Sequence, residues 1–120
     1  MTRFADTPTP PYYAVIFTST RTAGDHGYAD MAEKMLQLAA RQPGFLGFES
    51  AREEVGISVS YWADLESIRR WKADITHREA QRRGRAAWYS GYRVRISKVE
   101  LEYGMRPSNG GAGDPPTPFG

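Results

Sequence analysis

The stretch FLGFESAREEVGISVSYW, residues 45–62, decides the fold. It indicates two short strands, residues 45–52 and 56–62, with a link of hairpin length between them. The second strand alternates serines with the apolar residues Ile57, Val59 and Tyr61. A period of two is typical of a strand in a sheet with two unlike faces. The middle of the chain is therefore predicted to be an antiparallel hairpin.

On the N-terminal side of this hairpin, the sequence predicts a strand and then a helix. Residues 13–20, YAVIFTST, are rich in β-branched and aromatic side chains, which favour a buried strand. Apolar side chains then recur at spacings of three and four, as in an amphipathic helix, at Tyr28, Met31, Met35 and Leu38. Pro43 and Gly44 are expected to end that helix.

On the C-terminal side, a second helix is predicted to begin after Asp64, a residue type that caps helix N-termini. One side of this helix carries the apolar residues Leu65, Ile68, Trp71 and Ile75. Residues 74–76 are weak helix formers, so we expect a bend there. The helical pattern then continues over residues 77–90.

The last strand is predicted over residues 92–103 and would be unusually long. At about 3.3 Å per residue it would extend roughly 40 Å, more than one small sheet can cover. Its apolar residues change parity near Ser97 and Lys98, which predicts a β-bulge. The far half of such a strand needs a second chain to pair with.

The element order is strand, helix, strand, strand, helix, strand, which is typical of an α+β ferredoxin-like β-α-β-β-α-β fold. Right-handed crossovers place both helices on one face of the antiparallel sheet. The other face would be bare and apolar, and an exposed patch of that size favours a partner. The sequence therefore predicts a homodimer in which two sheets pack face to face.

Composition is that of one folded domain: 120 residues, of which 40% are hydrophobic and 25% charged. We expect the domain to span residues 12–105, between a flexible proline-rich tail at 1–11 and a disordered tail at 106–120. There is no cysteine, which excludes disulfides and thiol chemistry. No apolar run is long enough to cross a membrane and no signal peptide precedes the domain, so a cytoplasmic location is expected, without a membrane partner.

The net charge of +2 is supplied mainly by arginines between residues 69 and 95. Such a cluster either binds an anionic ligand or simply solvates a helix face. Nucleic-acid binding requires a sharper basic stripe with exposed aromatic residues. We therefore expect no nucleic-acid partner.

Two segments resemble the antibiotic biosynthesis monooxygenase family: QPGFLGFE, residues 42–49, and SYWADLESIRRW, residues 60–71. The resemblance covers about residues 12–103. It implies a dimeric α+β barrel with one pocket in each subunit, between the sheet and the two helices. The family contains cofactor-free oxygenases of polycyclic phenols, haem-degrading enzymes and many proteins without known activity, so the fold narrows the function without fixing it.

A cofactor-free oxygenase requires aromatic walls, a base that titrates near neutral pH, and a polar group for the substrate anion. The resemblance places Trp71 at the pocket tryptophan, although it could equally pack its helix on the sheet. His77 is the candidate base, since histidine has an ordinary pKa of about 6.5; the alternative is a solvent-facing residue. Arg93 is the candidate anion-binding residue, against the alternative of a salt bridge at the dimer rim.

Candidate substrate-binding residues complete the predicted site, although large aromatic residues more often pack in a core. They are Tyr61, Ser67, Trp88, Tyr92 and Arg95. The haem-degrading relatives have a histidine ligand where this chain has Gln81, and an asparagine where it has Ser19 and Thr20. A polyphenol-oxidising relative has an asparagine at the position of Ser67.

The function predicted from these residues is a cofactor-independent monooxygenase acting on a small aromatic or polyphenolic molecule. Two alternatives stay open: a haem-binding or haem-degrading protein, and a non-catalytic homodimer that binds a small ligand. No cofactor is expected, and haem is not favoured because of the residue at position 81. No glycine-rich phosphate loop, histidine pair at metal spacing or Ser-His-Asp set is present in the sequence.

Overall fold

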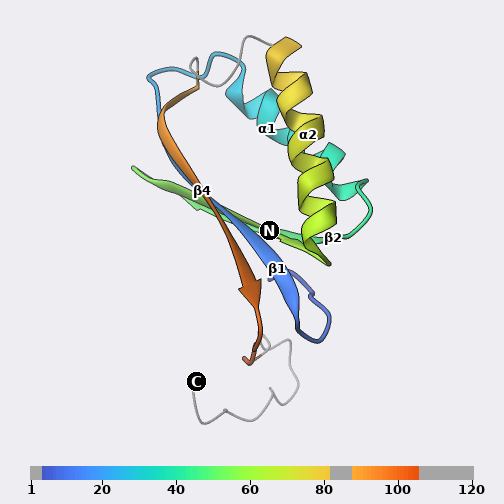
Figure 1. Cartoon of the computed structure of the whole chain (residues 1–120). Helices are drawn as coiled ribbons and strands as arrows, with labels where there is room; N and C mark the ends of the chain where they lie inside the picture. The colour runs from blue at the N-terminus through green and yellow to red at the C-terminus, as the bar shows by residue number, and fades with distance from the viewer. Residues whose placement is uncertain (1–3, 82–87, 106–120) are drawn as a thin grey trace.

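The structure, a computed structural model, describes residues 4–81 and 88–105; for residues 76–81 it describes the backbone alone. The elements in chain order are β1 (Tyr12–Arg21), α1 (Tyr28–Ala40), β2 (Phe45–Arg52), β3 (Gly56–Trp62), α2 (Leu65–Gln81) and β4 (Tyr89–Val99). The strands form one antiparallel sheet in the order β2-β3-β1-β4. Both helices lie on the same side of this sheet (Figure 1). The predicted α+β ferredoxin-like fold is confirmed.

The register of the strands assigns each side chain to one of two faces. We call the face that α1 and α2 cover the helix face, and the opposite one the far face. Trp62 of β3, which packs under α2, is paired with Tyr13 of β1. Because side chains alternate along a strand, the helix-face residues of β1 are Tyr13, Val15, Phe17 and Ser19. Their partners in β4 are Lys98, Ile96, Val94 and Tyr92, which therefore share that face.

The core lies between β3 and the two helices. Its centre is Trp62, which is fully buried, with Ile68 and Ala39 each 5% exposed. Phe45 meets the Trp62 ring edge-on, with 5.4 Å between centroids. On the α2 side, the Trp71 ring stacks on Trp62 at 6.1 Å. Ile68 and Trp71 of the apolar stripe predicted for the second helix thus pack on the hairpin that decides the fold, whereas Leu65 is 53% exposed.

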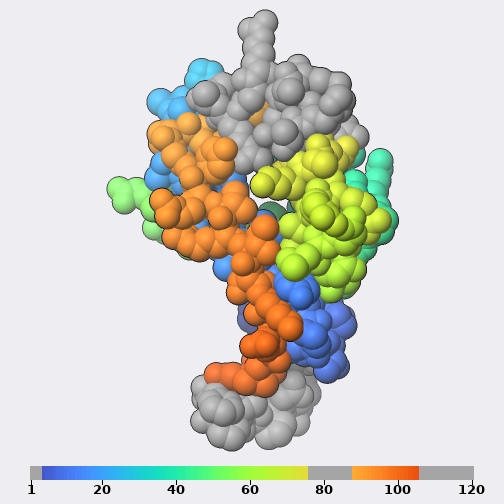
Figure 2. Space-filling view, in the orientation of Figure 1, coloured from blue at the N-terminus to red at the C-terminus, as the bar shows by residue number. Residues whose placement is uncertain are grey.

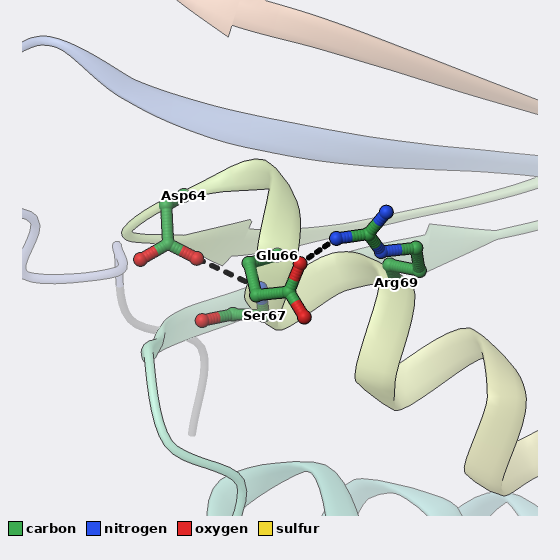
Figure 3. A network of polar contacts seen from close by, with 4 residues as sticks. All are labelled: Asp64, Glu66, Ser67 and Arg69. Carbon is green, nitrogen blue, oxygen red and sulfur yellow. Dashed lines mark hydrogen bonds and ion pairs between the residues drawn. The ribbon is translucent and has the colours of Figure 1, made fainter.

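The start of α2 is fixed by a capping hydrogen bond. The backbone N–H of Ser67 donates to Oδ1 of Asp64 at 2.7 Å (Figure 3), which confirms the predicted cap. Hydrogen bonds from Ser67 stabilise the charged carboxylate and hold the pKa of Asp64 below its ordinary value. From the same first turn, the exposed side chain of Glu66 forms an ion pair with Arg69.

Gly44 joins the end of α1 to this capped turn. It has a φ of 88°, in the left-handed region that favours glycine. Its carbonyl accepts a hydrogen bond of 2.8 Å from the N–H of Ala63. A side chain at position 44 would overlap the Ser67 hydroxyl and come within 2.7 Å of the Ser67 Cβ. The two segments that resemble the family are therefore in direct contact, through Gly44 and Ser67.

Three details predicted from the sequence are wrong. The second helix has no break at residues 74–76, because α2 is one helix from Leu65 to Gln81. The register between β1 and β4 is regular at Ser97 and Lys98 and shifts instead at the other end, between Thr20 and Arg21.

The third error concerns where the last strand ends. It runs from Tyr89 to Val99, not from residue 92 to 103, so Tyr89 and Ser90 belong to this strand and not to the helix predicted over residues 77–90. Val99 pairs with Tyr12, the first residue of β1, so later residues meet no partner strand in the described part of this chain. Prolines 10 and 11, which cannot donate backbone hydrogen bonds, precede Tyr12 and prevent β1 from starting earlier. The change of parity in the sequence therefore marks the end of the strand and not a bulge.

Two residues of the segment 4–11, which we expected to be a flexible tail, are bonded to the folded domain. The N–H of Ala5 donates to Oε2 of Glu49 at 2.8 Å, and Oε1 of the same carboxylate accepts from the Tyr61 hydroxyl at 2.7 Å. Glu102 in the same way accepts from the hydroxyls of Thr7 and Tyr12. Burial raises the pKa of Tyr12 and Tyr61, and their hydrogen bonds to Glu102 and Glu49 raise it further. The predicted disordered tail at 106–120 lies outside the described residues.

The contact of Gly44 with Ser67 predicts a specific loss of stability. We expect Gly44→Ala to lower the free energy of unfolding by about 3 kcal/mol, combining left-handed strain with overpacking. The control is Gly27→Ala: Gly27 has a φ of 82°, but no atom lies within 4 Å of the place that an added Cβ would take. It should cost only about 1 kcal/mol. Urea unfolding measures both, and equal losses would contradict the packing role of Gly44.

The cap at Asp64 predicts a pH dependence of stability. The folded state lowers the pKa of this carboxyl. The contribution of the cap to stability is therefore complete above the ordinary carboxyl pKa, and it is lost as the pH falls through the lower pKa of the folded state. Asp64→Asn keeps a capping oxygen but cannot titrate. We therefore expect the variant's thermal midpoint to fall less steeply than the parent's between about pH 5 and pH 2. Parallel melting curves across that range would exclude Asp64 as a source of acid sensitivity.

Candidate functional site

Aromatic side chains gather on the helix face near the end of β1. Phe17 stacks on Tyr92 of β4, with 5.4 Å between ring centroids, and meets Tyr89 edge-on at 5.2 Å. Tyr28, at the start of α1, meets the other side of Tyr89 at 5.7 Å. We call Phe17, Tyr28, Tyr89 and Tyr92 the aromatic cluster. It supplies ring faces and edges suited to an aromatic ligand.

Beside this cluster the helix face of the sheet is left open. The helices pack mainly over β2 and β3, while β1 and β4 form the other half of the sheet. Three side chains on the helix face of β4 are consequently exposed: Tyr92 by 51%, Val94 by 44% and Ile96 by 49%. Figure 2 shows a hollow between β4 and α2. β4 borders it on one side, and α2 borders it on the other.

A basic residue, Arg52, reaches into this region from the end of β2. Its side chain passes over Gly56, where any Cβ would overlap the guanidinium. Nη2 donates to the hydroxyl of Ser19, and Nη1 donates to the Ser19 carbonyl at 3.5 Å. Ser19 itself is only 2% exposed. The Arg52 Cζ lies 5.9 Å from the centre of the Tyr28 ring, so the guanidinium adjoins the aromatic cluster.

A second arginine, Arg21, also contacts the aromatic cluster. Its Cζ lies 3.5 Å above the Tyr28 ring, a cation–π contact. Its Nε donates to the carbonyl of Trp88 at 2.9 Å and its Nη2 to that of Gly24 at 3.2 Å. Arg21 is half-buried and makes three hydrogen bonds to backbone carbonyls around it, whereas Arg52 is exposed and makes two, both to Ser19.

Sequence reasoning missed Arg52, although one signal was available. Arg52 has the same parity as Phe48 and Ser50, which places it on the helix face, and its partner across the hairpin is Gly56. A glycine opposite an arginine at the end of a hairpin leaves room for the long side chain to cross the neighbouring strand. The contact with Ser19 joins residues 33 positions apart and could not be found from local patterns.

Four of the predicted site residues lie on the helix side. Trp71 is half-buried against Trp62 and borders the core, and Tyr92 belongs to the aromatic cluster. Ser67 is 2% exposed and lies against Gly44. Trp88 is 7% exposed, and its Nε1–H donates to the carbonyl of His26 at 3.0 Å. The contacts of Ser67 and Trp88 join segments of the fold.

The remaining predicted residues are not brought together with these. Arg93 and Arg95 pair with Thr18 and Ile16 of β1 and lie exposed on the far face. Tyr61 is also on that face, bonded to Glu49. The predicted grouping of Arg93 with Trp71 is therefore not found within one chain. His77 belongs to α2, but its side chain lies outside the described residues.

The residues that the structure describes contain no group of three or more histidine, cysteine, aspartate or glutamate side chains placed to hold a metal ion. His26 lies in the loop before α1, where its Nε2 is 2.9 Å from the Ala23 carbonyl. This histidine is exposed. No described helix is long and apolar enough to cross a membrane.

Comparison with known proteins places this geometry in a family. The family model described as antibiotic biosynthesis monooxygenase matches residues 11–83. The uncharacterized protein YqjZ of Bacillus subtilis is 50% identical over 98 residues, which cover 80% of this chain and 86% of YqjZ. The jasmonate monooxygenase ABM of Pyricularia oryzae is 30% identical over 92 residues, covering 72% of this chain and 43% of that enzyme.

Solved structures show the same fold at low identity. A variant of SnoaB, a cofactor-independent oxygenase from Streptomyces nogalater, superposes with a TM-score of 0.62 at 18% identity, covering 76% of this chain and 95% of that one. PA3566 from Pseudomonas aeruginosa gives a TM-score of 0.57 at 17% identity, covering 80% of this chain and 99% of that one. The matched family model spans more than half of the sequence, including the contact of Gly44 with Ser67. The chain belongs to the antibiotic biosynthesis monooxygenase family.

Proposed function

We propose that the protein is a cofactor-independent monooxygenase whose substrate is a small, electron-rich aromatic molecule bound in the hollow between β4 and α2. The observation that carries the proposal is the open helix face, where Tyr92, Val94 and Ile96 are each more than two-fifths exposed next to the aromatic cluster. Apolar side chains exposed together in a concave region favour a ligand. Family membership and the fold shared with SnoaB, a cofactor-independent oxygenase, support the type of reaction.

The reaction needs only a base and a shaped pocket, because the substrate supplies the electrons. Removal of the phenolic proton makes a ring carbon electron-rich, and that carbon transfers electrons to O2 and forms a C–O bond, giving a hydroperoxide. Loss of the remaining proton from that carbon breaks the O–O bond. A phenol and O2 thus give a quinone and one water molecule, with no external reductant.

Two side chains are proposed for these steps. Trp71, held by its stack on Trp62, forms the α2 wall of the hollow. His77 follows on the same helix and serves as the base, since an imidazole near its ordinary pKa of about 6.5 exchanges protons at neutral pH. Arg93 and Arg95 have no part in this proposal, because they lie on the other face of the sheet from Trp71.

We further propose that two copies pack through their far faces. The far face carries partly buried apolar residues, among them Ile16 and Val59, which pair with each other across β1 and β3. Its neighbour Ile57 is 48% exposed. A second sheet would remove these side chains from water, at about 25 cal/mol for each Å² of apolar surface.

The two histidines of the chain allow a matched test of the base. We expect His77→Ala to lower kcat/KM for naphthol oxidation about a hundredfold and to abolish the rise in rate around pH 6–7. His26→Ala should retain parental activity, because His26 lies in an exposed loop. An oxygen electrode with naphthol and dihydroxynaphthalene as substrates measures both.

Each outcome decides something about the proposal. A His77→Ala variant as active as the parent would remove His77 from the mechanism. Binding of these phenols without oxygen uptake would contradict the monooxygenase and support the non-catalytic ligand-binding alternative.

The proposed dimer has its own test. We expect the parent to sediment as a dimer at micromolar concentration, and Val59→Lys to sediment as a monomer because it places a charge on the far face. Val55→Lys is the control, since Val55 is 48% exposed in the hairpin turn and should leave the dimer intact. A well-folded monomer in the parent would contradict the proposed assembly.

A further inference from the structure

A cation beside the aromatic cluster is the feature that the proposed function leaves unexplained. Arg52 is the basic side chain that the structure holds beside the aromatic cluster while leaving it exposed. Three neighbouring residues define where its guanidinium lies. Ser19 accepts from both Nη atoms, Gly56 leaves room beneath the guanidinium, and Tyr28 lies beside it.

The charge of Arg52 is not neutralised within the described part of the chain. No carboxylate among those residues forms an ion pair with it, and its two hydrogen-bond acceptors are both neutral oxygens of Ser19. Asp25, in the loop next to Arg21, uses its two carboxylate oxygens on the backbone N–H groups of Gly27 and Ala29. A guanidinium has five N–H donors, so those not used by Ser19 are available to an anion.

We propose that Arg52, positioned by Ser19, binds an anionic oxygen group of the ligand, and that the ligand is an aromatic carboxylate or phenolate. This inference rests on the proposed function for the location of the binding site. The aromatic cluster receives the ring, and the planar guanidinium donates to the anion in the two-pronged geometry that arginine forms with carboxylates. The substrate class is thereby narrowed from any electron-rich ring to one that carries a negative charge.

The test compares charged and neutral naphthalene ligands by isothermal titration calorimetry. Naphthoate carries a carboxylate, dinitronaphthol is a phenolate at neutral pH, and naphthol is neutral. We expect Arg52→Gln to weaken the binding of at least one anion about tenfold or more and to leave naphthol unchanged. The anion that responds identifies the ligand class. Unchanged naphthol binding also shows that the variant is folded.

Two further variants separate position from charge. Arg95→Gln removes the same charge from the far face and should leave all three affinities at parental values. Gly56→Ala keeps the charge but displaces the guanidinium, so it should weaken the same anion as Arg52→Gln does. The proposal is overturned if Arg52→Gln leaves both anions unaffected, or if it weakens naphthol as much as the anions.

The binding test does not depend on whether the protein oxidises the ligand. Arg52-dependent anion binding without oxygen uptake would uphold this inference and reject the monooxygenase. Oxygen uptake, together with an affinity for anions that Arg52→Gln does not change, would reject this inference and uphold the monooxygenase.

Discussion

The contact between Gly44 and Ser67 is the constraint on which the rest of the structure depends. It fixes the start of β2 against the first turn of α2, which Asp64 caps. The helix that begins at that turn carries Trp71, whose ring stacks on Trp62. The helix is therefore held over β3, and β4 stays uncovered. A glycine with a left-handed φ has no side-chain substitute at this point, because any Cβ would enter the Ser67 side chain.

The same strand order that makes the core also makes the site. In the order β2-β3-β1-β4, two helices packed over β2 and β3 cannot cover a twisted sheet as far as its β4 edge. The resulting exposed apolar surface is concentrated at Tyr92, Val94 and Ile96. If the ligand binds where we propose, stability and binding use opposite halves of one face, and a substitution in the β4 half changes binding with little effect on the core.

Much of this could be predicted from the sequence, and the failures have physical reasons. The order and type of all six elements followed from periodicity, and the cap at Asp64 followed from residue type. The bulge was wrong because parity alone cannot show where the partner strand begins, here at Tyr12. Arg52 was missed because its position depends on Ser19, in a strand distant in sequence. The sequence could not show that Arg93 lies on the far face, because the alternation of side chains does not tell which face of β4 meets the helices.

Two buried serines, Ser19 and Ser67, each position a neighbouring residue. Both stand where the resemblance expects an asparagine, and both are 2% exposed. A serine side chain is too short to reach a ligand from such a depth, but it can hold a neighbour. Ser67 holds the Gly44 turn, and Ser19 holds the guanidinium of Arg52. In the role proposed for Arg52, the anionic oxygen of the ligand is therefore met by this arginine and not by the strand residue beneath it.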